Sequence, residues 1–268
     1  MNDRRSDNIH RLITPNTHML RGRGIYLLPN LFTTAALFAG FYAMMSSIHH
    51  HFQAAAIGIL AAIVLDGMDG RIARMTNTQS DFGAEYDSLA DMVSFGVAPA
   101  VLAYEWMLHD IGKFGFLVAF VYVSAAALRL ARFNVQKTVQ DKRYFKGLPS
   151  PSAAALVATT IWFAHDYQLH GEVLAVVLTL AVTACAALLM VSNIRYYSFK
   201  DLDLRGRIPF VVLLAMVLGF GFISVDPPLI LMLGFVVYTV SGVLFTLMQL
   251  RRSRAERRRD AARDRDVA

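Results

Sequence analysis

Four aspartates stand in two closely spaced pairs within one stretch of this 268-residue chain. Asp66 and Asp69 form the first pair, Asp87 and Asp91 form the second, and the residues before Asp66 are apolar. Ionised carboxylates at the edge of an apolar segment need partners, because uncompensated charge is costly there. Carboxylate oxygens are ligands for hard ions such as Mg²⁺ and Mn²⁺ rather than for zinc. The pattern therefore predicts a divalent-metal site, with two ions as the expected number.

Such a site is suited to displacement at phosphorus. Two ions that share carboxylates can hold a pyrophosphate and neutralise the charge of the leaving group. A carboxylate that is not fully engaged by metal could accept a proton from an incoming hydroxyl. The alternative is that the aspartates merely cap helix ends at a membrane surface. That alternative leaves unexplained why Gly70, Ala73 and Arg74 share a helix face with the first pair and why Gly83 shares one with the second.

Helical periodicity places each pair of aspartates on one face of a helix. The first half of the stretch puts five residues at i, i+3, i+4, i+7 and i+8: Asp66, Asp69, Gly70, Ala73 and Arg74. The second half puts three at i, i+4 and i+8: Gly83, Asp87 and Asp91. Small residues let another helix or a ligand approach closely, and the planar arginine cation suits phosphate. We therefore expect two helix ends that face each other across a small gap.

The elements that position these helices are expected to be membrane-spanning. The chain is 56% hydrophobic and 17% charged, whereas soluble domains carry about 25% charged residues. Its apolar residues form blocks of about 20, the length that crosses a bilayer as a helix. We expect an all-α, polytopic helical bundle of about eight transmembrane helices. The predicted segments are 26–47, 52–66, 92–110, 115–132, 149–165, 172–192, 207–224 and 227–249.

The distribution of charge predicts the orientation of these segments. With a cytoplasmic N-terminus, all of the 26 lysines and arginines except Lys113 fall on the cytoplasmic side, as the positive-inside rule requires. Both termini and the aspartates are then cytoplasmic, in the inner membrane of a cell. We expect no cleaved signal peptide, because residues 1–25 are polar and basic.

One membrane domain, residues 26–249, is therefore expected between a cytoplasmic arm, 1–25, and a basic tail, 250–268. The tail contains eight arginines and four acids. Because it adjoins a spanning segment, it is expected to meet anionic lipid headgroups rather than nucleic acid. The alternative is a solvated run that only fixes the topology.

The spacing of the motif is similar to the signature of the CDP-alcohol phosphatidyltransferases, Asp-x2-Asp-Gly-x2-Ala-Arg-x8-Gly-x3-Asp-x3-Asp, and every fixed position matches. In that family, the hydroxyl of an alcohol attacks the lipid-linked phosphate of a CDP-activated lipid and CMP leaves. The resemblance implies that Asp66, Asp69 and Asp87 bind the metals. Asp91 would share in metal binding and act as the general base. The resemblance also implies a homodimer.

The same resemblance implies a site for the CDP-lipid. Pro29-Asn30-Leu31-Phe32-Thr33 is similar to the start of the family's first span, whose polar side chains approach the nucleotide. The residues that would contact the CDP-lipid are Asn30, Thr33, Gly70, Ala73, Arg74, Ser80 and Gly83.

Other stretches resemble the branch that uses L-serine as the acceptor. They are Asp87–Ala100, Arg129–Asn134, Lys146–Ser152 and the region of Ser198–Lys200. The branch that uses glycerol phosphate tends to place a lysine after the fourth aspartate, where this chain has Met92. The resemblance thus implies transfer of a phosphatidyl group from CDP-diacylglycerol to L-serine.

Two arginines are candidates for holding the acceptor. Arg129 and Arg132 could bind a carboxylate in bidentate fashion or a lipid phosphate, or they could only mark the topology. The alternatives for function are inositol or glycerol phosphate as acceptor and, in another class, a cation-coupled transporter. A transporter would place its carboxylates near the bilayer midplane, in paired repeats. Here the aspartates cluster at one edge.

Overall fold

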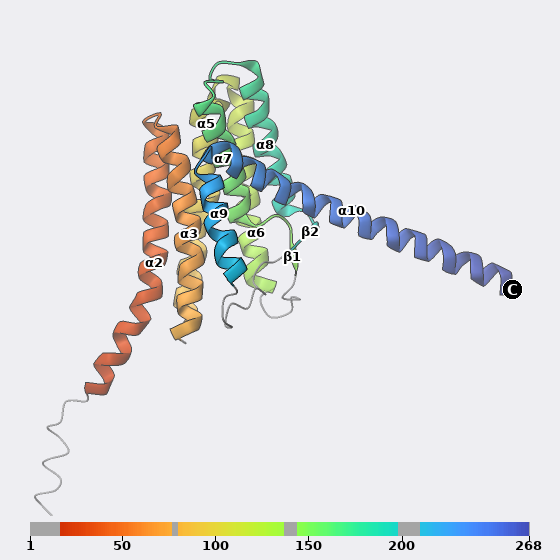
Figure 1. The fold of residues 1–268 in the computed structure, drawn as a ribbon, viewed down its shortest axis with the longest axis horizontal. Helices are drawn as coiled ribbons and strands as arrows, with labels where there is room; N and C mark the ends of the chain where they lie inside the picture. Colours follow the sequence, from red (N-terminus) through yellow and green to blue (C-terminus); the bar gives the residue numbers. More distant parts are fainter. Residues whose placement is uncertain (1–16, 77–79, 137–143, 198–209, 268) are drawn as a thin grey trace, which may run out of the picture.

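The computed structural model describes residues 17–76, 80–136, 144–197 and 210–267, and it is built almost entirely of helices (Figure 1). The α-helices are α2 Thr17–Ile48, α3 Phe52–Thr76, α4 Asp81–Asp91, α5 Ala98–Trp106, α6 Lys113–Gln136, α7 Ser150–Asp166, α8 Val173–Val191, α9 Phe210–Ile223 and α10 Pro227–Val267. A π-helical segment, Met92–Val97, joins α4 to α5, and a 3₁₀ turn, Leu108–Ile111, precedes α6.

Five helical segments of the described chain are long and apolar enough to cross a membrane. They are Pro29–Ile48, Phe52–Thr76, Lys113–Val135, Val173–Val191 and Pro227–Gln249. The protein therefore has the helices of an integral membrane protein, as predicted. The other three predicted segments overlap shorter helical elements, α5 with its π-helical start, α7 and α9. The total number of crossings and the placement of the termini stay predictions.

The helix that carries the first aspartate pair runs through Arg74 to Thr76, as its helical spacing predicted. The structure departs from the expectations at two other places. The last helix continues through the basic tail to Val267. The all-α expectation also misses two short strands, β1 Tyr144–Lys146 and β2 Arg195–Tyr197, which pair in antiparallel fashion. This pair joins the segment before α7 to the segment after α8.

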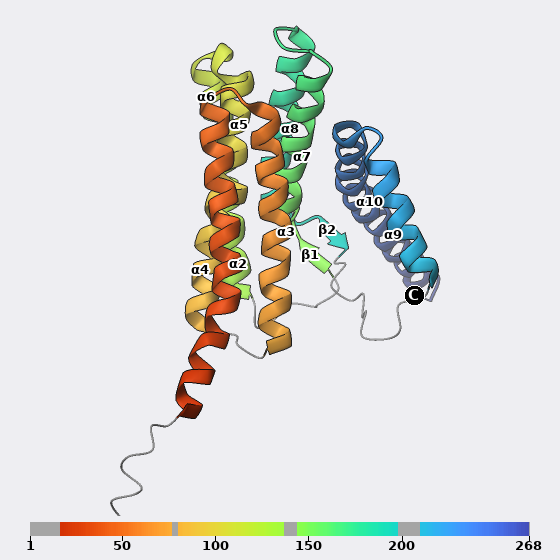
Figure 2. The ribbon, with the colours of Figure 1, turned by 60° about the vertical axis from the view of Figure 1, so that its left-hand side comes forward.

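Helices α2 and α3 form an antiparallel pair that lies side by side in both views (Figure 2). Small residues let their backbones approach, as is common between membrane helices. A Cβ atom added at Gly58 of α3 would lie 3.1 Å from the Ala43 Cβ of α2. The pairing matters for the site, because α2 and α3 each contribute polar residues at the same end of the bundle.

The π-helical segment is locked against α2. The Ser94 hydroxyl donates a hydrogen bond of 3.1 Å to the Ala36 carbonyl. A Cβ atom added at Gly40 would lie 2.4 Å from the Ser94 Oγ and 2.7 Å from its Cα. The second contact is with backbone, so a rotamer change cannot relieve it. The absence of a side chain at Gly40 therefore lets the π-helical segment, which continues directly from α4 and its aspartate pair, lie close against α2.

We expect the Gly40→Ala variant to be destabilised, because the added methyl group overlaps the Ser94 backbone. Overpacking of this kind costs about 1–3 kcal/mol. Thermal unfolding of the detergent-solubilised protein measures the effect as a lower midpoint. Gly234→Ala is the control, since a Cβ atom at Gly234 meets nothing within 4 Å. Equal midpoints for the two variants would contradict the tight α2 contact.

Helix α10 packs against α7 and β2. A Cβ atom added at Gly242 would lie 2.2 Å from Cε1 of the buried Tyr196 ring. The Tyr196 hydroxyl donates a 3.4 Å hydrogen bond to the Thr239 carbonyl. Beyond this contact, α10 runs away from the bundle (Figure 1). The β2 strand therefore anchors one segment of α10 beside the start of α7.

Candidate active site

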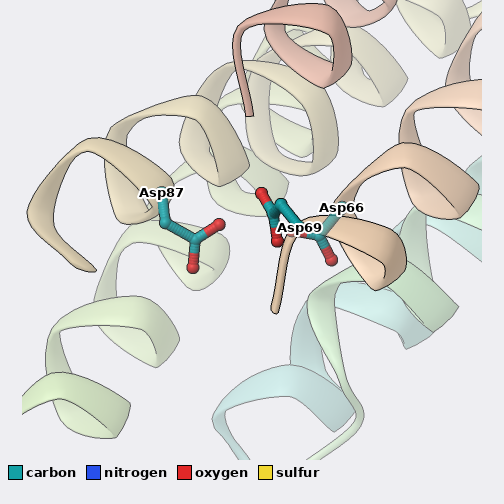
Figure 3. A group of neighbouring side chains, drawn as sticks. All are labelled: Asp66, Asp69 and Asp87. Carbon is teal, nitrogen blue, oxygen red and sulfur yellow. The ribbon is translucent and has the colours of Figure 1, made fainter. Parts of the chain in front are cut away.

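The first three aspartates converge at one end of the bundle. Asp66 and Asp69 lie one turn apart on α3, and Asp87 lies on α4. One carboxylate oxygen from each lies within 4.8 Å of the other two. Figure 3 shows the three side chains reaching toward one another from the two helices. The predicted juxtaposition of two helix ends is therefore what the structure has.

The start of α4 determines which way Asp87 points. Ser80 is the N-cap of this helix, and its hydroxyl accepts a 3.0 Å hydrogen bond from the Gly83 backbone N–H. Such a cap fixes the residue at which a helix begins and therefore the phase of its faces. Asp87 follows Gly83 by one turn and so lies on the same face, toward α3.

Helix α2 supplies the polar residues that were predicted for the nucleotide. The Thr33 hydroxyl donates a 2.7 Å hydrogen bond to the Oδ2 of Asp69, and both side chains are buried. A Cβ atom at Gly83 would lie 3.3 Å from the Asn30 Oδ1 and 3.1 Å from the Ser80 Oγ. Asn30, Ser80 and Gly83 therefore meet beside the aspartates, although they come from two different helices.

The remaining predicted contacts lie on the last turns of α3. Ala73 is half-buried, and Arg74 is exposed in the last turn of the helix. A Cβ atom at Gly70 would lie 4.0 Å from Arg74 Nη1, so the guanidinium folds back over the glycine. Their roles toward a CDP-lipid stay predictions.

Asp91 joins the cluster from the last residue of α4. Its side chain is half-buried and hydrogen-bonded to Asp66, and it also interacts electrostatically with Asp87 and Arg129. Two carboxyl groups can form a hydrogen bond only if one of them holds a proton. Four acids this close repel one another, and bound cations would relieve the repulsion. The all-oxygen donor set fits a hard divalent ion.

The two predicted acceptor arginines have different surroundings. Arg129 Nη1 donates a 2.7 Å hydrogen bond to the Ser150 Oγ, and the guanidinium interacts with Asp91. Arg132 Nη2 donates a 2.6 Å hydrogen bond to the Asn193 Oδ1, after the end of α8. Arg129 therefore interacts electrostatically with Asp91 without forming a direct ion pair with a carboxylate among the described residues.

The segment before α7 explains how Ser150 reaches Arg129. Gly147 has a positive φ of 84°, and its N–H donates a 2.8 Å hydrogen bond to the Ile194 carbonyl. A Cβ atom there would lie 2.3 Å from the Met190 carbonyl oxygen. The Gly147-Leu148-Pro149 segment is therefore the turn that begins α7. The predicted Ser198–Lys200 region lies outside the described residues.

Several polar contacts near the site were not predicted from the sequence. The hydroxyls of Thr34 and Tyr86 lie 2.9 Å apart and join α2 to α4. Asn134 Nδ2 donates a 3.0 Å hydrogen bond to the Ser88 Oγ and joins α6 to α4. The spacing of these residues carries no signal, because each pair is made by residues far apart in the chain.

Comparisons with known proteins agree with the geometry. The family model for CDP-alcohol phosphatidyltransferase matches residues 26–191. A CDP-diacylglycerol–serine O-phosphatidyltransferase of Helicobacter pylori is 36% identical over 228 residues, which cover 84% of this chain and 94% of that protein. The enzyme of the same name from Bacillus subtilis is 34% identical over 174 residues, 65% of this chain and 91% of that protein. The chain therefore belongs to the CDP-alcohol phosphatidyltransferase family.

Proposed function

We propose that this protein transfers a phosphatidyl group from CDP-diacylglycerol to L-serine, which yields phosphatidylserine and CMP. The observation that carries the proposal is the convergence of Asp66, Asp69 and Asp87 within 4.8 Å, with Asp91 hydrogen-bonded beside them. The similarity to serine O-phosphatidyltransferases over 84% of the chain supports serine as the acceptor.

The aspartates divide the work of the reaction. Asp66, Asp69 and Asp87 would hold divalent metal, Mg²⁺ or Mn²⁺, with Asp91 sharing a second ion; bound metal supplies positive charge for the pyrophosphate. Asp91 takes the proton of the serine hydroxyl. The serine oxygen then forms a bond to the lipid-linked phosphorus, and the bond from that phosphorus to the CMP phosphate breaks. The proton remains on Asp91 until it passes to solvent.

The CDP-lipid is held by the residues that surround the aspartates. Asn30 and Ser80, with Gly83 between them, would face the nucleotide where α2 meets α4. Thr33 keeps the Asp69 carboxylate in one orientation through their hydrogen bond. Gly70 and Ala73 leave space on α3, and Arg74 supplies a cation for phosphate.

Arg129 is the residue we propose for the acceptor carboxylate. It donates to Ser150 and interacts with Asp91, the proposed base. A serine bound through its carboxylate here would have its hydroxyl on the side of the base. Arg132 is hydrogen-bonded to Asn193, and we propose that it mainly holds the end of α8.

The proposed setting is the inner membrane, with the site on the cytoplasmic side, where soluble serine can enter and CMP can leave. The positive-inside distribution of basic residues supports this orientation. The helical, arginine-rich end of α10 would then meet anionic headgroups. We also propose a homodimer, as the family resemblance implies.

The proposal predicts that the purified protein releases CMP from CDP-diacylglycerol when Mn²⁺ or Mg²⁺ and L-serine are supplied. Inositol and glycerol 3-phosphate, offered one at a time, should react at least about 100-fold more slowly, because they lack the carboxylate. A reaction without any acceptor gives the background of hydrolysis. Equal rates with inositol would overturn serine as the acceptor. Solute uptake driven by a cation gradient, without CMP release, would favour a transporter.

A further inference from the structure

Helix α10 lies outside the residues matched by the family model, 26–191, yet one of its side chains interacts electrostatically with Arg129, the proposed acceptor residue. The hydroxyls of Tyr238 on α10 and Ser152 on α7 are hydrogen-bonded, and Tyr238 interacts electrostatically with Arg129 on α6. Arg129 in turn donates to Ser150 on α7. We call these four residues, Arg129, Ser150, Ser152 and Tyr238, the Arg129 cluster.

The Arg129 cluster has unused capacity for an anion. The Nε of Arg129 is buried and has no hydrogen-bond partner among the described residues. Arg129 also forms no direct ion pair with a carboxylate in the described part of the chain. A buried cation is costly unless an anion accompanies it, and the planar guanidinium suits a carboxylate. The first turn of α7 adds the positive end of a helix dipole at Ser150 and Ser152.

The position of Tyr238 is set by packing rather than by its own flexibility. Its ring lies 5.7 Å, between centroids, from the buried ring of Tyr196. Tyr196 is itself fixed against α10, because its ring occupies the space that a side chain at Gly242 would fill. The β2 strand, through Tyr196, therefore holds α10 so that the Tyr238 hydroxyl faces the start of α7.

We propose that Tyr238 is a specificity-determining residue, whose hydroxyl forms a second hydrogen bond to the acceptor carboxylate that Arg129 binds. This inference rests on the proposed function and adds the last helix to the acceptor site. Ser152 orients the Tyr238 hydroxyl, and Ser150 orients the guanidinium of Arg129. Because Arg129 also interacts with Asp91, a carboxylate held in the Arg129 cluster keeps a small hydroxy amino acid next to the proposed base.

The test is steady-state CMP release by the full-length Tyr238→Phe variant, with L-serine and CDP-diacylglycerol varied in turn. Loss of a hydrogen bond to a charged group should raise the KM for L-serine about 10-fold. The kcat and the KM for CDP-diacylglycerol should stay near their wild-type values. With L-serinamide, which keeps the hydroxyl and lacks the carboxylate, wild type and variant should have the same kcat/KM.

Tyr196→Phe is the matched control, because it makes the same change on the neighbouring ring, whose hydroxyl bonds the Thr239 carbonyl instead. It should leave the KM for L-serine unchanged. Equal increases in the two variants would assign the effect to the packing of α10 and overturn the proposal. An increase in the KM for CDP-diacylglycerol alone would place a lipid phosphate in the cluster and also overturn it.

A second variant guards against a folding defect. Ser152→Ala removes the partner of Tyr238 and leaves its ring in place, so the KM for L-serine should rise by a smaller factor, about threefold. An unchanged KM for L-serine in both Tyr238→Phe and Ser152→Ala would overturn the role of Tyr238 while the proposed function stands. If the wild-type protein itself releases no CMP in response to serine, the proposed function fails first, and this inference fails with it.

Discussion

The Asp91→Asn variant is expected to lose roughly 10²–10⁴-fold in kcat for serine-dependent CMP release, the contribution of a well-placed general base. Asparagine has nearly the same size and can still hydrogen-bond Asp66, but it cannot accept the proton of the serine hydroxyl. Asp91 is the aspartate that interacts with Arg129, the proposed acceptor residue, as well as with Asp66 and Asp87. Steady-state rates at saturating Mn²⁺ and serine measure the loss.

Asp81→Asn is the control for this prediction. Asp81 begins the same helix but is exposed in its first turn, so its variant should keep at least about half of the wild-type kcat, since a single exposed charge at a helix end contributes little. Undiminished turnover in Asp91→Asn would remove the general-base assignment. A loss that disappears when Mn²⁺ is raised further would instead assign Asp91 to metal binding alone.

The Asp69→Asn variant is expected to bind Mn²⁺ more than about 100-fold more weakly than the wild-type protein. Loss of a residue that only orients a metal ligand typically lowers affinity by about 10–100-fold, and loss of the ligand itself should cost more. Asp69 is 6% exposed and converges with Asp66 and Asp87, so the substitution removes one charged oxygen donor from a buried position. Calorimetric titration of the metal-free protein with Mn²⁺ measures the affinity without any turnover. CMP release should fall in parallel.

The Thr33→Val variant distinguishes the role of the proposed metal ligand, Asp69, from the role of the residue that orients its carboxylate. The substitution leaves the Asp69 carboxylate in place and removes its 2.7 Å hydrogen bond, so the Mn²⁺ affinity should fall by about 10–100-fold. Excess Mn²⁺ should restore CMP release in Thr33→Val but not in Asp69→Asn. Wild-type Mn²⁺ affinity in Asp69→Asn would contradict the metal assignment.

The helices that carry the site were largely predictable, because helical periodicity is a local property of the chain. The spacing of Asp66 to Arg74 requires one helix face, and α3 runs through all of these residues to Thr76. The apolar blocks likewise predicted the bounds of α6, α7 and α8 to within a few residues, whereas α2, α3 and α10 extend well beyond theirs. The two short strands were missed, because β1 and β2 have three residues each and depend on each other for hydrogen bonds.

The contacts between helices were less predictable. Arg129 and Arg132 carry the same side chain three residues apart, and the sequence alone made both of them candidates for holding the acceptor. In the structure, Arg129 donates a hydrogen bond to Ser150 and interacts electrostatically with Asp91, whereas Arg132 donates a hydrogen bond to Asn193. Their difference arises from which neighbouring helix each guanidinium meets, and periodicity within one helix contains no such information.

The sequence by itself predicted the chemistry of the site, because four carboxylates at helical spacing beside an apolar block offer an all-oxygen donor set for hard cations. The tertiary structure decided which other residues take part. Thr33 meets Asp69 because α2 pairs with α3, and Tyr238 meets Ser152 because Tyr196 fills the space left by Gly242. These contacts depend on close packing between segments far apart in the chain, and such packing is determined only when all the helices are in place.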